Sequence, residues 1–292
     1  MTDTQNSYKD EYTILSGTNK EAVFTKDNQK ILCEGTQATI ISTGNEVELV
    51  DNYISDNGHF REDHIGEPDV LHGDNSFFIS TGNDVKISAG KNSHSFATGD
   101  RSDIDYNECS MSDGTILSEG YNFGEICAVI TGSESRISSP DNLEKAILLS
   151  TGDDNQIVGF KGTNSILAGN RNIFETESFS DKSVINYGKN SKIVADGGVF
   201  IDLGENTKIQ TSGEAVIFTK PGAEIDVSHL QEEDNSVIIT AYFNEKPWLP
   251  TDEDREVSRI VQLYRFNVDF FRKKLYKVGK KGELIDITLS NQ

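Results

Sequence analysis

The chain has 292 residues, of which 35% are hydrophobic and 26% charged, and its mean hydropathy is −0.48. Its 48 acidic and 27 basic side chains give a net charge of −21. Such acidity repels nucleic acids and anionic membranes and attracts basic proteins or cations. These values disfavour direct nucleic-acid binding and any membrane association. They are compatible with a partner that carries positive charge.

The acidity is unevenly distributed along the chain. Residues 251–292 hold nine basic and seven acidic side chains, whereas residues 1–250 have a net charge of −23. This surface either keeps a β-rich protein soluble or recruits a basic partner. The N-terminus lacks the pattern of a signal peptide, and no run of apolar residues is long enough to span a bilayer. We therefore expect a cytoplasmic protein whose three cysteines, Cys33, Cys109 and Cys127, are reduced thiols.

A tail of residues 1–11 precedes a repeat that is marked by small turns. Ile-Ser-Thr-Gly-Asn occurs at 41–45 and again at 79–83, and Leu-Ser-Thr-Gly-Asp stands at 149–153. Successive glycines often lie 8 or 9 residues apart, as at Gly73, Gly82, Gly90 and Gly99. Each half-unit has a polar turn followed by a short alternating strand, in which glycine and Asn or Asp are expected to supply positive φ. Two half-units predict a parallel β-solenoid, similar to a β-helix or β-roll, of about 17–18 residues per coil.

The expected acidic solenoid covers residues 12–232 and is interrupted twice. Residues 52–72 form a charged insertion, and residues 105–127 are a degenerate stretch. Insertions in a solenoid often form its binding surface. A small C-terminal β cap is expected over residues 233–292, with strands near 234–243 and 257–266 and a terminal hairpin over 275–287.

Two features together resemble a family of uncharacterised low-complexity proteins of bacteria and their phages, which repeat a phrase like Ala-Thr-Ser-Gly-Asp-Tyr-Ser. The matching phrases here are residues 95–102 and the Ser-Thr-Gly-Asn/Asp copies. The C-terminal strands 238–243 and 266–269 and the hairpin 276–284 are similar to the closing segments of that family. The resemblance implies a phage or mobile-element origin. It brings no known activity and no known catalytic residues.

Calcium is the first metal to consider, because glycine-rich β-rolls bind it through Gly-Gly-X-Gly-X-Asp turns. Turn carboxylates occur in residues 152–155 and 99–103, but the doubled glycine occurs only at Gly197-Gly198, where no Asp follows. The three histidines of the 52–72 insertion have gaps that fit no standard zinc spacing. We expect no metal and no cofactor, with calcium as the one alternative.

A carbohydrate-active enzyme is a second alternative, because parallel β-helices often host lyases and hydrolases. Such enzymes need paired carboxylates in a groove with aromatic side chains. Asp103, Asp105 and the Glu62/Asp63 pair could serve in that role. The chain has no phosphate-binding loop, no Gly-X-Ser-X-Gly and no dinucleotide fingerprint.

The leading hypothesis is a non-enzymatic solenoid that binds a basic protein partner, as an inhibitor or immunity protein. One version of it is DNA mimicry, which requires a continuous carboxylate stripe. A self-assembling structural or fibre module is the alternative, which makes a homo-oligomer a further expectation. The candidate partner-binding residues lie in or beside the two interruptions: His59, Arg61, Glu62, Asp63, His64, Asp103, Asp105, Tyr106, Tyr121 and Phe123.

Overall fold

The computed structural model describes residues 12–33, 37–51, 75–90, 92–106, 124–138, 145–159, 163–176, 182–228, 237–241, 262–265, 275–280 and 283–288. In these residues every regular element of more than one residue is a β-strand, and the strands stack as a solenoid. The prediction of an all-β, parallel β-solenoid is thereby confirmed. No helix in the described part of the chain has the length and apolarity that crossing a bilayer requires.

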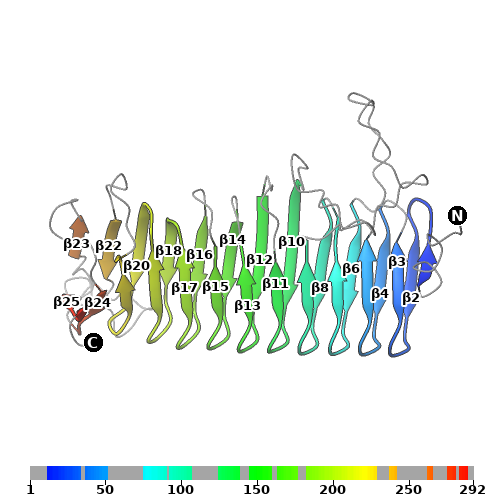
Figure 1. Ribbon diagram of the computed structural model, residues 1–292, viewed down its shortest axis with the longest axis horizontal. Helices are drawn as coiled ribbons and strands as arrows, with labels where there is room; N and C mark the ends of the chain where they lie inside the picture. The colour runs from blue at the N-terminus through cyan, green and yellow to red at the C-terminus, as the bar shows by residue number, and fades with distance from the viewer. Residues whose placement is uncertain are drawn as a thin grey trace, which may run out of the picture. The chain divides into compact units, whose positions relative to one another are not determined.

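The chain folds as two compact units, residues 1–149 and 150–292. In the first unit, consecutive strands alternate between two parallel sheets (Figure 1). The odd sheet contains β1 (Thr13–Leu15), β3 (Lys30–Cys33), β5 (Glu48–Asp51), β7 (Lys86–Ser88), β9 (Asp103–Asp105) and β11 (Arg136–Ser138). The even sheet contains β2 (Glu21–Phe24), β4 (Thr39–Ser42), β6 (Phe77–Ser80), β8 (His94–Ala97), β10 (Glu125–Ile130) and β12 (Lys145–Ser150), whose last residue opens the second unit.

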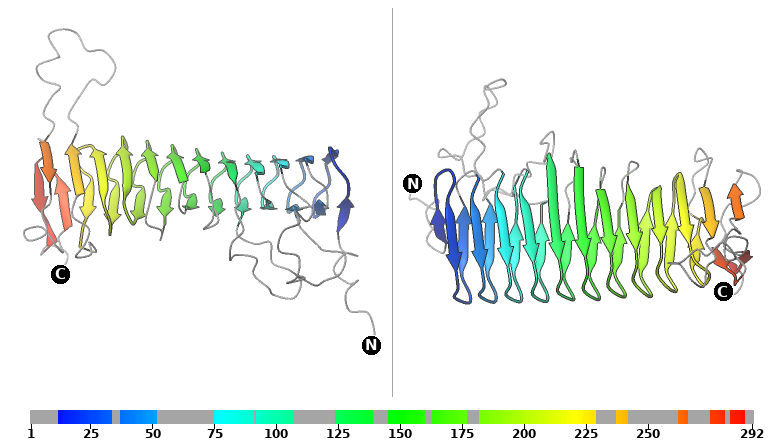
Figure 2. Two further views of the ribbon diagram at one scale, coloured as in Figure 1. Left: turned by 90° about the horizontal axis from the view of Figure 1, so that it is seen from above. Right: turned by 180° about the vertical axis from the view of Figure 1, so that it is seen from behind.

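The second unit repeats this alternation, and its two rows of strands are separate when seen from above (Figure 2). Its odd sheet contains β13 (Gln156–Val158), β15 (Ile173–Glu175), β17 (Lys192–Ala195), β19 (Lys208–Thr211), β21 (Glu224–Asp226), β24 (Leu275–Val278) and β25 (Leu284–Asp286). Its even sheet contains β14 (Thr163–Leu167), β16 (Ser183–Asn186), β18 (Gly198–Asp202), β20 (Ala215–Thr219), β22 (Val237–Ala241) and β23 (Gln262–Arg265).

The strand register gives the length of each coil. Equivalent residues of neighbouring coils are 16 to 19 positions apart where the repeat is regular. Two intervals are much longer, 38 residues between Asn45 and Asn83 and 33 residues between Asn92 and Glu125. Both contain a predicted interruption, and both connect an odd strand to an even strand. The edges of the 105–127 stretch belong to β9 and β10, whereas residues 107–123 lie outside the described residues.

The core is a narrow column of inward-facing side chains in each sheet. On the odd sheet of the first unit, Ile31, Leu49, Ile87 and Ile104 occupy the same register position and are almost fully buried. Ile157, Phe174, Ile193 and Ile209 do the same in the second unit. β-Branched residues suit these pleated positions. Because each strand buries only one or two large side chains, the fold needs few apolar residues.

Antiparallel pairing begins at the C-terminal strands. β22 lies within the strand expected at 234–243 and pairs in parallel with β20, so it extends the even sheet. β23 then pairs antiparallel with β22, and β24 pairs antiparallel with β21 and β25. Pairing of this kind covers the edge that a parallel stack would otherwise leave open. The proposed domain boundary between 232 and 233 stays a prediction.

The corner that connects each even strand to the next odd strand corrects one expectation. Glycine and Asn or Asp were expected to supply positive φ there. Positive φ falls two positions after the glycine, on Asn or Asp in corners such as Asp84 and Asn190 but also on Glu46 and Arg101, and Gly222 is a corner glycine that does have it. Gly82 is required for space instead, because a Cβ at this position would overlap the carbonyl oxygen of Gly44 in the coil below. The same overlap recurs at most glycines of this corner.

Gly82→Ala is expected to lower the free energy of unfolding by about 2 kcal/mol or more, because backbone rather than a flexible side chain must move. Thr81→Ala is the matched control, since the Thr81 side chain is exposed beside it. Urea denaturation followed by circular dichroism measures both variants. Equal midpoints for the two variants would contradict the close approach of these backbones.

Candidate functional site

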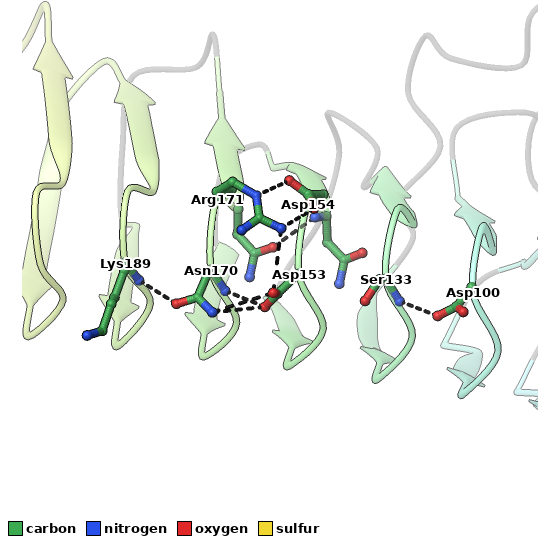
Figure 3. A network of polar contacts seen from close by, with 9 residues as sticks. Asp100, Ser133, Asp153, Asp154, Asn170, Arg171 and Lys189 are labelled. Carbon is green, nitrogen blue, oxygen red and sulfur yellow. Dashed lines mark hydrogen bonds and ion pairs between the residues drawn. The ribbon is translucent and has the colours of Figure 1, made fainter.

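The even-to-odd corners of the first unit are joined by a ladder of Asn and Asp side chains. The Oδ1 atom of Asn45 accepts the backbone N–H of Asn83 at 2.9 Å, and Oδ1 of Asn83 accepts the N–H of Asp100 at 2.9 Å. Asp100 accepts the N–H of Ser133 at 2.8 Å (Figure 3). Each turn therefore uses its polar side chain to hold the next coil.

The second unit has the same ladder, and a guanidinium joins it as in the first unit, where Arg101 donates to Asp84 at 2.6 and 2.8 Å. Asp153 accepts the backbone N–H of Asn170 at 2.8 Å, and Asn170 accepts the N–H of Lys189 at 3.1 Å. The Arg171 guanidinium donates two hydrogen bonds to Asp154, at 2.7 and 2.5 Å, and lies 3.6 Å from Asp153 (Figure 3). The turn carboxylates considered for calcium are thus engaged with N–H groups and a guanidinium. No group of three or more potential metal-ligating side chains gathers in the described residues.

One column of outward positions on the odd sheet alternates in charge in the first unit but not in the second, where Ile173, Lys192 and Lys208 follow one another. In the first unit Lys30, Glu48, Lys86, Asp103 and Arg136 occupy one register column, and Lys30 lies 3.8 Å from Glu48. In the second unit Lys208 lies 3.4 Å from Glu224. Opposite charges on adjacent strands attract, so this column stabilises the stack. It is not the continuous carboxylate stripe that DNA mimicry requires.

The outward positions of the even sheet are apolar instead. In the first unit one register column holds Val23, Ile41, Ile79, Phe96 and Val129. A second column holds Thr39, Phe77, His94 and Cys127, and only Glu21 at its start is charged. We call the outward side chains of these two columns the first apolar face.

The second unit carries an equivalent surface, which we call the second apolar face. Its register columns are Ile166, Ile185, Ile201 and Phe218, and Asn164, Ser183, Val199 and Val216. None of these eight residues is charged. On the odd sheet of the same unit, outward positions include Glu175, Lys192, Lys208, Glu224 and Asp226.

Side chains of both apolar faces reach solvent. Val23 is 64% exposed, Phe218 is 41% exposed and Val199 is 39% exposed. The rings of Phe77 and Phe96 pack with centroids 5.1 Å apart, and the His94 ring stands edge-on to Phe77 at 6.5 Å. Partial burial raises the pKa of the Cys127 thiol, which keeps this residue uncharged at neutral pH. Apart from Glu21, the outward side chains of both faces are therefore mostly uncharged.

No family model, no curated protein and no solved structure matches this chain. The resemblance to low-complexity phage and bacterial proteins accordingly stays a prediction. What the chain does has to be argued from its own surfaces.

Three of the ten predicted partner-binding residues lie in the described part of the chain. Asp103 and Asp105 face outward on β9, the first between Lys86 and Arg136 and the second between Ser88 and Ser138. Tyr106 is only 1% exposed, and its hydroxyl group lies 3.3 and 3.2 Å from the carbonyl oxygens of Ser93 and Cys127. The structure therefore places Tyr106 in the core, because its ring fills the space inside the coil. The other seven candidates, His59, Arg61, Glu62, Asp63, His64, Tyr121 and Phe123, lie outside the described residues.

The carbohydrate-enzyme hypothesis required carboxylates and aromatic side chains in one groove. In the described residues Asp103 and Asp105 lie on the odd sheet, whereas Phe77, Phe96 and Phe218 point outward from the even sheet. The described geometry does not bring the two kinds of side chain together.

Sequence reasoning missed the apolar faces, although a signal for them exists. Odd strands such as Lys86–Ser88 and Arg136–Ser138 alternate between polar and apolar residues. Even strands such as Phe77–Ser80 and Glu125–Ile130 have apolar residues at both alternating positions. Strands that are apolar on both sides are typical of sheets that are buried on both faces.

Arg171→Gln is expected to lower stability slightly at pH 7, because it removes the ion pair with Asp154. The guanidinium holds the pKa of the Asp154 carboxyl below its ordinary value. A depressed folded-state pKa gives stability that is present at neutral pH and lost as the pH falls through it. The difference in stability between the variant and wild type should therefore disappear at acidic pH, and thermal unfolding measured from pH 7 downward checks this. Salt at about 0.5 M should reduce the same difference, and a difference that depends on neither pH nor salt would contradict an ionic origin.

Proposed function

We propose that this chain is a non-enzymatic protein-interaction module whose working surfaces are the first and second apolar faces. The observation that supports this proposal is the near absence of charge from the register columns of the two faces, although Glu125 and Lys145 face outward elsewhere on the same sheet. Among the eighteen outward positions of both faces only Glu21 is charged, in a chain in which 26% of residues are charged.

The energetic argument is that exposed apolar area is unfavourable. Each Å² left in water costs about 25 cal/mol relative to burial. Soluble proteins seldom expose contiguous apolar surface of several hundred Å² unless a partner covers it. Five strands of about 13 Å at a spacing of about 4.8 Å give the first apolar face roughly 300 Å² of projected area. The four strands of the second apolar face add roughly 250 Å².

The acidic-surface hypothesis receives less support from the described residues. They contain 22 acidic and 16 basic side chains, a net charge of −6, so most of the −21 belongs to the segments outside them. Several described carboxylates are also engaged internally, as in the pairs of Asp84 with Arg101 and Glu205 with Lys189. Recruitment of a basic partner stays a proposal for the remaining segments.

Photo-crosslinking tests the proposed surface. A benzophenone amino acid replaces Val199 on the second apolar face or, as the matched control, Val194 on the odd sheet of the same unit. Cell extract of the native host is added and the mixture is irradiated. We expect defined crosslinked protein bands from position 199 and few from position 194, because only the apolar face has a partner.

The same experiment can refute the proposal. Equal yields from positions 199 and 194 would show that the apolar face has no special affinity. Crosslinking of position 194 alone would place the interaction on the charged sheet instead.

A further inference from the structure

We infer that the partner seated on the apolar faces is a second copy of this chain, so that two solenoids pack sheet against sheet. This inference rests on the proposed function and adds the identity of the partner. Three properties of the faces support it: their periodicity, their shape and their charge.

Periodicity is the property that discriminates most between partners. Parallel pairing places equivalent side chains of β2, β4, β6, β8 and β10 in rows about 4.8 Å apart. A partner that fills the grooves between all of these rows must itself repeat with that spacing over the same distance. An unrelated protein has that repeat only where it exposes a β-sheet of the same extent, whereas a second copy has it by construction.

Shape supports the same partner. Outward side chains alternate along each strand in two columns, such as Phe77 and Ile79 on β6 or Val199 and Ile201 on β18. Two such surfaces can interdigitate at the separation of about 10 Å that stacked sheets adopt. The side chains concerned are mostly Val, Ile and Phe, which are stiff and lose little conformational entropy on packing.

Charge decides which surface a second copy can approach. A chain with a net charge of −21 repels its own kind. The outward column of the odd sheet in the first unit carries five charged side chains, and burying them against a second copy would cost their hydration. On the apolar faces that cost is smallest, because Glu21 is the only charged residue in their register columns.

The area that two copies can bury determines how tightly they are expected to bind. Each face offers roughly 250 to 300 Å² of projected area per copy, so a pair that meets through one face buries about 500 to 600 Å² or somewhat more. Specific protein interfaces bury about 1,200–2,000 Å² in total, and weak contacts lie below that range. The pair should therefore be weak and reversible, with a dissociation constant on the order of 100 micromolar.

Two substitutions of the same chemistry test the pairing. Ile185→Glu places a carboxylate in the middle of the second apolar face, between Ile166 and Ile201. Ile173→Glu is the matched control, because it adds the same charge to the odd sheet of the same unit, between Gln156 and Lys192. Sedimentation velocity of the purified full chain gives the mass as a function of concentration.

Wild type and Ile173→Glu are expected to shift from 32.2 kDa toward twice that mass as the concentration rises. Ile185→Glu is expected to stay monomeric or to associate at least about tenfold more weakly, since a carboxylate cannot be buried unpaired in an apolar interface. Circular dichroism and urea unfolding check that both variants are folded. If Ile185→Glu fails to fold, Val199→Lys replaces it, because Val199 is already 39% exposed.

Cys127 supplies a second measurement without any substitution. It belongs to the first apolar face, in register with His94. Its alkylation, followed by mass spectrometry of the Cys127 peptide, should slow as the chain associates. Alkylation that is independent of protein concentration would contradict pairing through this face.

The outcomes separate the inference from the proposed function. A wild-type chain that stays at 32.2 kDa up to several hundred micromolar overturns the second copy as partner. If position 199 still crosslinks to a different protein in extract, the proposed function stands and only the inference fails. Binding to phosphatidylcholine vesicles that Ile185→Glu abolishes would overturn both, because the faces would then seat on lipid.

Discussion

The backbone contact between equivalent corners of successive coils is the constraint on which the rest of this structure depends. The residue of positive φ donates its N–H to the coil above, as Glu46 does to Asn83 and Asp154 does to Asn170. The side chain one position earlier holds the same neighbour through its oxygen. Glycine is needed just before it, because the preceding coil leaves no room for a Cβ. Once these three residues are in place, the register of both sheets follows.

That register determines the surfaces as well as the core. Because equivalent residues stack on one another, any preference at one outward position is repeated as a column. On the odd sheet of the first unit one column alternates between Lys or Arg and Asp or Glu, which favours the stack. On the even sheet of the same unit one column is Val, Ile and Phe, which leaves an apolar surface. The two sheets of one coil therefore present different surfaces.

Much of the fold could be predicted from the sequence, because the turn phrase is short, frequent and regularly spaced. The Ser-Thr-Gly-Asn copies locate the corners, and alternating strands such as Lys86-Ile87-Ser88 locate the core. The role of glycine was predicted wrongly, because spacing cannot tell a residue that must turn from one that must be small. The burial of Tyr106 was missed for a similar reason. An aromatic residue next to Asp105 suggests a surface position in the sequence, but Tyr106 follows the end of β9 and its ring points inward. The apolar faces were missed because all apolar residues of the even strands were attributed to the core.

The two corners of a coil differ in what they tolerate. From β2 to β19 the even-to-odd corner keeps one length, with six positions from the end of each even strand to the start of the next odd one. The odd-to-even side instead contains the coils of 38 and 33 residues, and strand pairing resumes beyond each of them without a shift. The even-to-odd corner thus keeps a fixed length, whereas the odd-to-even side accepts insertions. New segments can be added on the odd-to-even side, by evolution or by design, while the even-to-odd corner keeps the spacing of the strands unchanged.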